Sequence, residues 1–276
     1  MTSPRHMSRA FPVLEGARPF AIAHRGSRIL WPENTMVAFQ GAVSLGYTWL
    51  ETDIHLTANG VVVCLHDHTL DRTTSATGPV AGRTFAELAD VDAGHHHAPE
   101  EGHPFRGAGA VIPSLEEVVT TYPDVSVVVD LKCDGTEGPL ARLVDRLSLW
   151  DRLVVGSFSD ARIRRFRALT GGRVATSTGP RATLVRWAAS GVRLRPPAAH
   201  ALQVPITYGR LRVITRRSVA AHRSAGSQVH VWTVNERPLM EQLLEWGVDG
   251  IITDRPDLLR TVMMERGAWT GRPHGV

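Results

Sequence analysis

The sequence has few residues of the kinds that crosslink a chain, and no segment typical of export or membrane insertion. Its two cysteines, Cys64 and Cys133, form neither a disulfide framework nor a metal-ligand spacing. Both lie in apolar, strand-like segments, so we expect buried reduced thiols. Residues 1–18 lack the apolar core of a signal peptide, and no apolar stretch approaches the ~18 residues that a membrane span needs. No run of Lys and Arg with interleaved aromatic residues indicates nucleic-acid binding. These absences favour a cytoplasmic protein without stable membrane insertion and without a nucleic-acid partner.

The residues that are present compose an ordinary globular protein. Apolar residues make up 43% of the 276 residues, which is enough for a large core. A chain of this length suits one or two domains, and (β/α) barrels commonly fill it as a single domain. The formal net charge of +4 and the isoelectric point near 9.7 come from arginine far more than from lysine. Such a balance attracts anions, phosphate esters included, without choosing among them, and it leaves the oligomeric state open.

Short β-branched segments alternate with amphipathic segments along the chain. Alternating strands and helices predict an α/β fold with a parallel sheet, and eight such strands predict a closed TIM (β/α)8 barrel. The expected strands are Phe20–Ala23, Thr48–Asp53, Ser126–Leu131, Leu153–Ser157, Arg173–Thr176, Ala201–Val204, Val229–Val234 and Gly250–Thr253. The expected helices include Asn34–Leu45, Gly138–Leu149, Asp160–Leu169, Thr215–Ala225 and Arg237–Trp246.

One further apolar run, Val61–Leu65, follows the second strand too closely for a helical crossover. The Asn59-Gly60 pair before it is typical of a two-residue hairpin turn, so we expect an antiparallel return strand. With the turn at these two residues, position 53 pairs with position 66. The hairpin would therefore bring His66 beside Asp53.

Residues 71–113 resemble no barrel unit, because they are rich in Gly, Ala, His and Thr and contain only one short helical piece near Phe85–Ala89. We predict a small insertion over the C-terminal mouth of the barrel, where the loops after strands build active sites. Regular structure resumes at Ser114, whose spacing to Glu117 has the form of a capping box. The predicted organisation is an N-terminal extension over 1–18, one barrel domain over 19–265 and a tail over 266–276.

Acidic and basic side chains recur two residues apart at the ends of two expected strands. Glu51 and Asp53 share one face of a strand, and Asp130 and Lys132 repeat this on another. The C-terminal ends of barrel strands form the face that carries active sites. Two carboxylates about 4 Å apart repel by roughly 4 kcal/mol at an effective dielectric constant of about 20, so three gathered there need a cation. Oxygen ligands suit Mg²⁺ or Ca²⁺ better than zinc. Each acid taken alone is better explained by a surface salt bridge or a helix cap.

Short motifs with histidine and carboxylate residues recur in a fixed order. They are His24-Arg25-Gly26, Pro32-Glu33-Asn34-Thr35, Glu51-Thr52-Asp53 and His66-Asp67. With them the chain resembles the glycerophosphodiester phosphodiesterase family, whose signature has these motifs in this order. Further matches are Leu70-Asp71-Arg72-Thr73-Thr74, Ile112-Pro113-Ser114-Leu115, Trp232-Thr233-Val234-Asn235, Gly247-Val248-Asp249-Gly250 and Thr253-Asp254. The resemblance spans about Ala21 to Leu259, which is nearly the whole chain.

The resemblance implies a TIM barrel, one divalent cation, and hydrolysis of glycerophosphodiesters to glycerol 3-phosphate and an alcohol. It implies that the substrate's own 2-hydroxyl attacks first, and that water then opens the resulting cyclic phosphate. The roles that it assigns are metal ligand for Glu51, Asp53 and Asp130, general base and general acid for His24 and His66, phosphate binding for Arg25 and Lys132, and pocket lining for Trp232. Which histidine acts as base is not readable from sequence, and we assign His24.

The third metal ligand departs from the family pattern. The family usually has Glu in a Glu-hydrophobic-Lys triplet, whereas this chain has Asp130-Leu131-Lys132. Aspartate is one methylene shorter, which favours looser or water-mediated coordination or a changed metal preference. We expect the activity to survive, since oxygen ligation is retained and Ca²⁺ tolerates variable geometry better than Mg²⁺ does.

Several neighbouring residues admit a structural and a functional interpretation. Glu33 could lie behind the site, although a structural role is slightly favoured. Asp67 and Asp254 could orient active-site groups, or they could be turn and cap residues. Asn34 is expected to cap the following helix. Asp71 and Arg72 could form a local ion pair that fixes the loop after His66.

Two rival functions remain open at this point. One is a lysophospholipase D-like phosphodiesterase on the same scaffold, which the modest apolar content of the insertion does not favour. The other is a non-catalytic protein that binds phosphate esters, which the retention of His24 and His66 disfavours and Asp130 leaves possible. The alcohol head group of the substrate and the metal used are not determined by the sequence.

Overall fold

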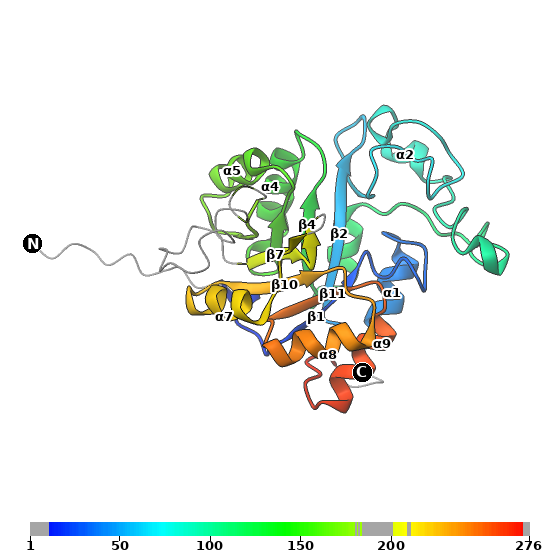
Figure 1. Cartoon of the computed structure of the whole chain (residues 1–276). Coiled ribbons are helices and arrows are strands. Elements are labelled where there is room, and N and C mark those ends of the chain that lie inside the picture. The colour runs from blue at the N-terminus through cyan, green and yellow to red at the C-terminus, as the bar shows by residue number, and fades with distance from the viewer. Residues whose placement is uncertain (1–10, 180, 182, 184–200, 209–210, 273–276) are drawn as a thin grey trace, which may run out of the picture.

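The computed structural model describes residues 11–179, 181, 183, 201–208 and 211–272, and parallel strands form its centre (Figure 1). The sequence predicted these eight strands, two of them with the observed bounds and the others to within a few residues. The strands are β1 (Phe20–His24), β2 (Trp49–Leu56), β4 (Ser126–Leu131), β5 (Leu153–Gly156), β6 (Ala175–Thr176), β7 (Ala201–Pro205), β10 (Gln228–Trp232) and β11 (Gly250–Thr253). Their runs of Val, Ile and Leu suit strands that are buried on both faces.

These strands close into a barrel. Neighbours pair in parallel in the order β6, β5, β4, β2, β1, β11, β10, β7. Ser177, directly after β6, forms a parallel bridge with Ala201 of β7, and the Thr178 N–H donates to the Ala201 carbonyl at 3.1 Å. Because this bridge joins the two ends of the row, the predicted TIM barrel is confirmed.

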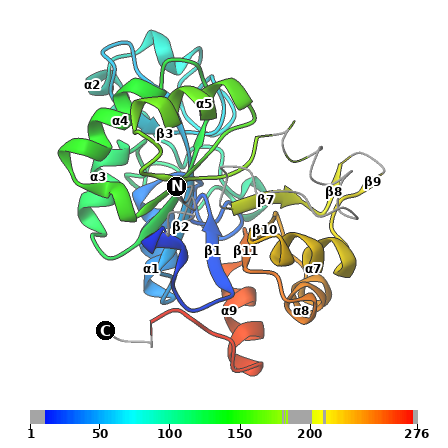
Figure 2. The same cartoon turned by 90° about the vertical axis from the view of Figure 1, so that its left-hand side faces the viewer.

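Helices cover the outside of the barrel (Figure 2). They are α1 (Met36–Ser44), α3 (Leu115–Thr121), α4 (Glu137–Arg146), α5 (Asp160–Leu169), α7 (Arg216–Ser224), α8 (Arg237–Trp246) and α9 (Pro256–Glu265). Hydroxyl side chains begin several of them by accepting a backbone N–H, which satisfies a donor that the first turn leaves free. Ser114 forms the predicted capping box with Glu117 at the start of α3. For α1 the predicted cap was wrong, because Thr35 accepts the N–H of Ala38, whereas Asn34 precedes the cap.

Two apolar layers hold the barrel together. One lies between strands and helices and includes Ala21, Leu50 and Ile54, and the other lies inside the barrel and includes Phe20 and Ile22. Complete burial of a side chain such as that of Leu50 contributes roughly 1.5–3 kcal/mol. Strand alternation then decides which polar side chains face inward. Those at the C-terminal ends of the strands include His24 on β1, Glu51 and Asp53 on β2, and Asp130 on β4.

The chain segments outside the predicted barrel domain also pack against it. Phe11, Val13 and Leu14, around a 3-10 helix over Pro12–Leu14, are buried in the inner apolar layer. At the other end the Trp269 ring packs edge-on against Tyr47, with ring centroids 5.2 Å apart. These contacts show that residues within the predicted extension and tail contribute to the core, while the domain bounds themselves stay a prediction.

The predicted return strand exists, but its register differs from the prediction. Strand β3 (Val62–Cys64) is antiparallel to β2, with Ile54 opposite Cys64, and the Leu65 N–H donates to the Asp53 carbonyl at 3.0 Å. Position 53 therefore lies opposite 65, not 66. The physical reason is the turn: the Thr57 N–H bonds the Val61 carbonyl, so the loop has one residue more than a two-residue hairpin.

Residues 71–113 form the predicted insertion beside the mouth of the barrel, at the upper right of Figure 1. Its short elements are a 3-10 helix over Val80–Gly82, α2 (Phe85–Leu88) and a 3-10 helix over Pro99–Glu101. It has its own small apolar cluster, in which Leu70, Val80 and Leu88 pack against Val63 of β3. Further short elements elsewhere are a 3-10 helix over Leu149–Asp151 and the paired strands β8 (Thr207–Tyr208) and β9 (Leu211–Arg212). Among the described residues no helix is long and apolar enough to cross a membrane.

Candidate active site

His24 ends β1 on the inner face of the barrel, and a buried carboxylate fixes its ring. Its Nδ1 lies 2.7 Å from Asp254 Oδ1, just beyond the end of β11. Its Nε2 lies 3.8 Å from Glu51 Oε2 on the neighbouring strand. Burial disfavours the charged imidazolium, yet the carboxylates of Glu51 and Asp254 outweigh burial and raise the pKa of His24 above its ordinary value. These carboxylates therefore make the imidazolium of His24 easier to form than that of an isolated histidine.

Asp254 is itself held by several groups. Its side chain is fully buried and accepts hydrogen bonds from Arg28 Nε at 2.8 Å and from Asn235 Nδ2 at 3.2 Å. Burial acts against ionisation, but the bonds from His24 and Arg28 lower the pKa of Asp254 to about 2. An ionised carboxylate in this position fixes the tautomer of the imidazole it contacts and leaves Nε2 facing the mouth.

The acids of β2 and β4 meet as predicted. The parallel register places Asp53 opposite Asp130 and His24 opposite Glu51. Lys132, two residues after Asp130, places its Nζ 2.8 Å from Asp53 Oδ1 and 2.7 Å from Asp130 Oδ2. The structure thus brings together Glu51, Asp53, Asp130 and Lys132 at the C-terminal ends of the strands.

Arg25 supplies the second positive charge of this group. Its Nε forms an ion pair with Asp53 Oδ2 at 2.9 Å, and its Nη1 donates to Glu33 Oε1 at 2.9 Å. Its backbone N–H also donates to Glu51 Oε2 at 3.1 Å. Lys132 and Arg25 overcome the effect of burial and lower the pKa of Asp53. Glu51 differs, because burial and the charge of Asp53 raise its pKa to about 7.

The loop that carries Arg25 has an unusual backbone. Arg25 has φ 54° and Asn34 has φ 57°, a left-handed conformation that side chains other than those of glycine, asparagine and aspartate seldom adopt. Gly26 lies so close to α1 that a Cβ would come within 2.6 Å of Ala38. Asn34, expected as a cap, instead donates to Asp53 Oδ2 at 3.2 Å and accepts from Thr52 at 2.7 Å. The loop is thereby tied to the strand that carries Asp53.

His66 follows β3 and also has a carboxylate behind it. Its Nδ1 lies 2.6 Å from Asp67 Oδ1, and Asp67 accepts a hydrogen bond from Arg72 Nε. The predicted pair of Asp71 with Arg72 was wrong: Asp71 accepts the N–H of Gly78, while Arg72 turns toward Asp67 and Glu33. Despite partial burial, Arg72 and His66 lower the pKa of Asp67 to about 2. The two histidines thus have matching Asp and Arg neighbours.

Aromatic rings border the same end of the barrel. Trp232 ends β10, and its ring meets Phe158, in the loop after β5, with centroids 5.7 Å apart and planes at 77°. Lys132 Nζ lies 5.4 Å from the centroid of the Phe158 ring. Phe158 is 62% exposed. Trp232 was predicted at the mouth, whereas Phe158 was not.

Sequence reasoning also gave Arg28 no role, and gave Arg72 only a possible ion pair with Asp71. Both lie within matched motifs or next to them, but an exposed arginine carries no local signal of its partner. Composition did hold one signal that pointed to Lys132, because it is the only lysine in the chain among 31 basic residues. The remaining residues of the Lys and Arg total are all arginines.

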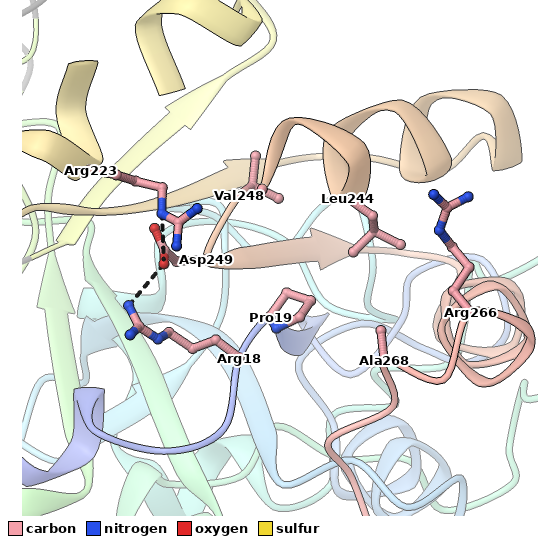
Figure 3. A pocket seen from close by; sticks show the side chains of 9 residues that line it. Arg18, Pro19, Arg223, Leu244, Val248, Asp249, Arg266 and Ala268 are labelled. Atoms are coloured by element: carbon pink, nitrogen blue, oxygen red, sulfur yellow. Dashed lines mark hydrogen bonds and ion pairs between the residues drawn. The ribbon is translucent and has the colours of Figure 1, made fainter. Parts of the chain in front are cut away.

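A separate cavity of about 260 Å³ lies at the opposite end of the barrel, before β1 and β11 (Figure 3). It is bordered by Arg18, Arg223 and the buried Asp249, whose Oδ1 is 2.9 Å from Arg18 Nη1 and 3.5 Å from Arg223 Nε. None of the predicted site residues lines it. Within the described residues no group of three or more His, Cys, Asp or Glu has the geometry of a ready metal site.

Comparison with known proteins identifies the family. A model of the glycerophosphoryl diester phosphodiesterase family matches residues 24–258. The chain is 38% identical over 258 residues to a Mycobacterium tuberculosis protein named "Probable glycerophosphodiester phosphodiesterase 2". The aligned region covers 91% of this chain and 93% of that protein.

Two solved structures illustrate the likeness in fold. A glycerophosphodiester phosphodiesterase from Agrobacterium tumefaciens has a TM-score of 0.72 at 25% identity, over 88% of this chain and all of that one. An Oleispira antarctica phosphodiesterase, solved with the product sn-glycerol-3-phosphate, has a TM-score of 0.71 at 24% identity, over 89% of this chain and 97% of that one. The chain belongs to the glycerophosphoryl diester phosphodiesterase family and is a phosphoric diester hydrolase.

Proposed function

We propose that this enzyme hydrolyses glycerophosphodiesters to glycerol 3-phosphate and an alcohol, with His24 and His66 as its proton-transfer groups. The observation that carries the proposal is the meeting of His24, Glu51, Asp53 and Lys132 at the C-terminal ends of three neighbouring strands. The product bound in the Oleispira antarctica structure is the one proposed here.

Arg25 and Lys132 would bind the phosphate. A phosphodiester is an anion, so attack on phosphorus must overcome repulsion, and positive groups fixed in advance reduce that cost. Both side chains are mostly buried, at 12% and 16% exposure. Arg25 is already aligned by Glu33 and Asp53. The planar guanidinium suits two phosphate oxygens, whereas the ammonium acts as a point charge.

A divalent cation fits the donor set of the site. Glu51 and Asp53 are 6% and 1% exposed, and burial together with the charge of Asp53 raises the pKa of Glu51 to about 7, so a nearby cation would favour its ionised form. Glu51, Asp53 and Asp130 would hold Mg²⁺ or Ca²⁺, since all their donors are oxygens. Lys132 bridges Asp53 and Asp130, so it would share these acids with the cation. Such a cation would polarise the phosphoryl oxygens, an effect that contributes several kcal/mol in metal-dependent enzymes.

The histidines would move the protons. Asp254 and Asp67 contact the Nδ1 atoms, which leaves each Nε2 for the substrate. In the first step one Nε2 takes the proton of the glycerol 2-hydroxyl, whose oxygen attacks phosphorus, and the other protonates the departing alkoxide. Water then opens the cyclic phosphate with the two roles reversed. Proton transfer of this kind typically accelerates a reaction by roughly 10²–10⁴-fold.

A release assay for glycerol 3-phosphate tests this proposal. A panel of deacylated phospholipids is the substrate, and the enzyme is assayed before and after chelation and after addition of Mg²⁺ or Ca²⁺. We expect turnover that chelation abolishes and one of the two cations restores, and severe weakening in Lys132→Ala. Full activity after chelation would remove the cation from the proposal. Binding of these esters without turnover with either cation would favour a binding protein instead.

A lysophospholipase D-like activity is the second candidate, because exposed apolar side chains border the mouth. Ile29, in the loop after β1, is 45% exposed and Phe158 is 62% exposed, and Phe158 packs against Trp232. Assay of a long-chain lysophospholipid beside its deacylated counterpart separates the two activities. We expect the deacylated ester to be the better substrate, and a clear preference for the lysolipid would reverse the assignment.

A further inference from the structure

Arg72, the second residue of the insertion, joins two carboxylates that support different parts of the proposed site. Its Nε donates to Asp67 Oδ2. Its Nη1 and Nη2 donate to Glu33 Oε2 and Oε1 at 2.9 and 2.8 Å, as a bidentate pair. A guanidinium can reach two carboxylates at once because its donors form a rigid planar fork.

The first carboxylate, Asp67, supports His66 and has few other restraints. Its bonds within the described residues are those to His66 and Arg72, and its side chain is 28% exposed. The corresponding acid behind His24 is fully buried and is held by Asn235 as well as Arg28. Asp67 therefore depends on one arginine for its position, whereas Asp254 does not.

The second carboxylate, Glu33, supports Arg25. Its side chain is 8% exposed and lies between the guanidinium groups of Arg25 and Arg72, with Nη1 of Arg25 at 2.9 Å. Although burial acts in the opposite direction, the bonds from these two arginines lower the pKa of Glu33. Without Arg72, Glu33 keeps Arg25 as a partner. Loss of Arg72 should therefore disturb the position of Arg25 less than that of His66.

We propose that Arg72 is a positioning residue that fixes His66 through Asp67 and Arg25 through Glu33, and so ties the insertion to catalysis. This inference rests on the proposed roles of His66 and Arg25. Within the described residues the side chain of Arg72 bonds to the two carboxylates and to neither His66 nor Arg25. It follows that its loss acts mainly on the orientation of the His66 imidazole.

Steady-state kinetics of Arg72→Ala test the proposal. Loss of a partner that orients a metal-binding side chain typically costs about 10–100-fold in activity. We expect a fall in kcat of similar size for the His66 imidazole, with a smaller change in KM. Arg106→Ala is the matched control, because Arg106 is an exposed arginine of the same insertion whose side chain, within the described residues, donates to the His95 carbonyl alone, at 2.9 Å. Its kcat should equal that of wild type. Added methylguanidinium ion should restore part of the activity of Arg72→Ala. It should leave the activity of Arg106→Ala unchanged.

Two further variants separate positioning from folding. In an Asp67→Asn background, Arg72→Ala should cost much less than in wild type, because residues that act through one network are not additive. Arg28→Ala should lose less activity than Arg72→Ala, since Asp254 keeps its bond to Asn235. Arg72→Lys should fold and remain impaired, because an ammonium cannot reproduce the planar fork by which three nitrogens of Arg72 donate to the two carboxylates.

Several results would overturn the inference: unchanged kcat in Arg72→Ala or Arg72→Lys, an effect on KM alone, full additivity with Asp67→Asn, or equal losses in Arg28→Ala and Arg72→Ala. If the Arg72→Ala protein does not fold, Arg72→Lys decides, alone and in the Asp67→Asn background. A wild-type enzyme without turnover would instead contradict the proposed function, so the two failures are distinguishable.

Discussion

His230 makes the stability of the barrel sensitive to acid. Its side chain is fully buried in β10, with the Phe20 ring edge-on at 5.8 Å and Gln228 Oε1 at 3.2 Å from Nε2. Its Nδ1 has no hydrogen-bond partner within the described residues. Burial and then the charge of Arg18 lower the pKa of His230 from 6.5 to about 4.

The sign and size of the effect follow from this lowered pKa. Below pH 6.5 the unfolded chain takes up a proton at this position, whereas the folded chain does so only near pH 4. Stability is therefore lost as the pH falls through this window. With one pKa unit equal to about 1.4 kcal/mol, the loss between about pH 7.5 and about pH 5 is roughly 2 kcal/mol.

Urea unfolding of wild type and His230→Gln at these two pH values measures this contribution. We expect the stability difference between the two pH values to shrink by roughly 2 kcal/mol in the variant, whatever its stability at the higher pH. Equal differences in both proteins would refute the reasoning, because they would show that His230 takes no part in the acid dependence.

Three further predictions concern single side chains. Asp130→Glu is expected to keep activity in the release assay. It should also lower the concentration of cation needed for half-maximal activity, because the longer side chain reaches further toward the proposed cation. Complete loss of activity would show that position 130 has been misplaced in the site. Asp53 and Asp130 outweigh burial and raise the pKa of Lys132, so this amine should react slowly with amine reagents at about pH 9, and bound glycerol 3-phosphate should protect it. Mass spectrometric mapping of the single lysine measures the labelling. Fast labelling that glycerol 3-phosphate does not slow would contradict the prediction. Burial raises the pKa of the Cys64 thiol to about 12, so a thiol reagent should label it only after unfolding; rapid labelling of the native protein at this position would contradict its burial.

Much of the fold followed from the sequence because strand and helix periodicity are local properties. The bounds of β4, α5 and β11 were predicted to the residue, since each is an apolar or amphipathic run with clear ends. The register of the hairpin was wrong by one residue, because it depends on whether Thr57 or Ala58 closes the turn. That choice rests on the hydrogen bond from Thr57 to Val61, which the Asn59-Gly60 pair alone does not determine.

The candidate site was predicted in part. Residues that share a strand face, such as Glu51 with Asp53, are placed by alternation alone, and their meeting with Asp130 follows from the parallel order of the barrel. The partners of Arg72 lie 5 and 39 positions away, and Asp254 lies 230 positions from His24. Such contacts depend on loop conformation, including the left-handed backbone at Arg25 and Asn34, which no local pattern encodes.

The most direct test of the proposed mechanism compares three histidine variants in the glycerol 3-phosphate release assay. His24→Ala and His66→Ala each remove a proposed proton-transfer group, and His68→Ala removes an exposed histidine two residues from His66. We predict a loss of roughly 10²–10⁴-fold or more in the first two and wild-type turnover in the third. Turnover close to wild type in either His24→Ala or His66→Ala, with the protein folded, would contradict the account.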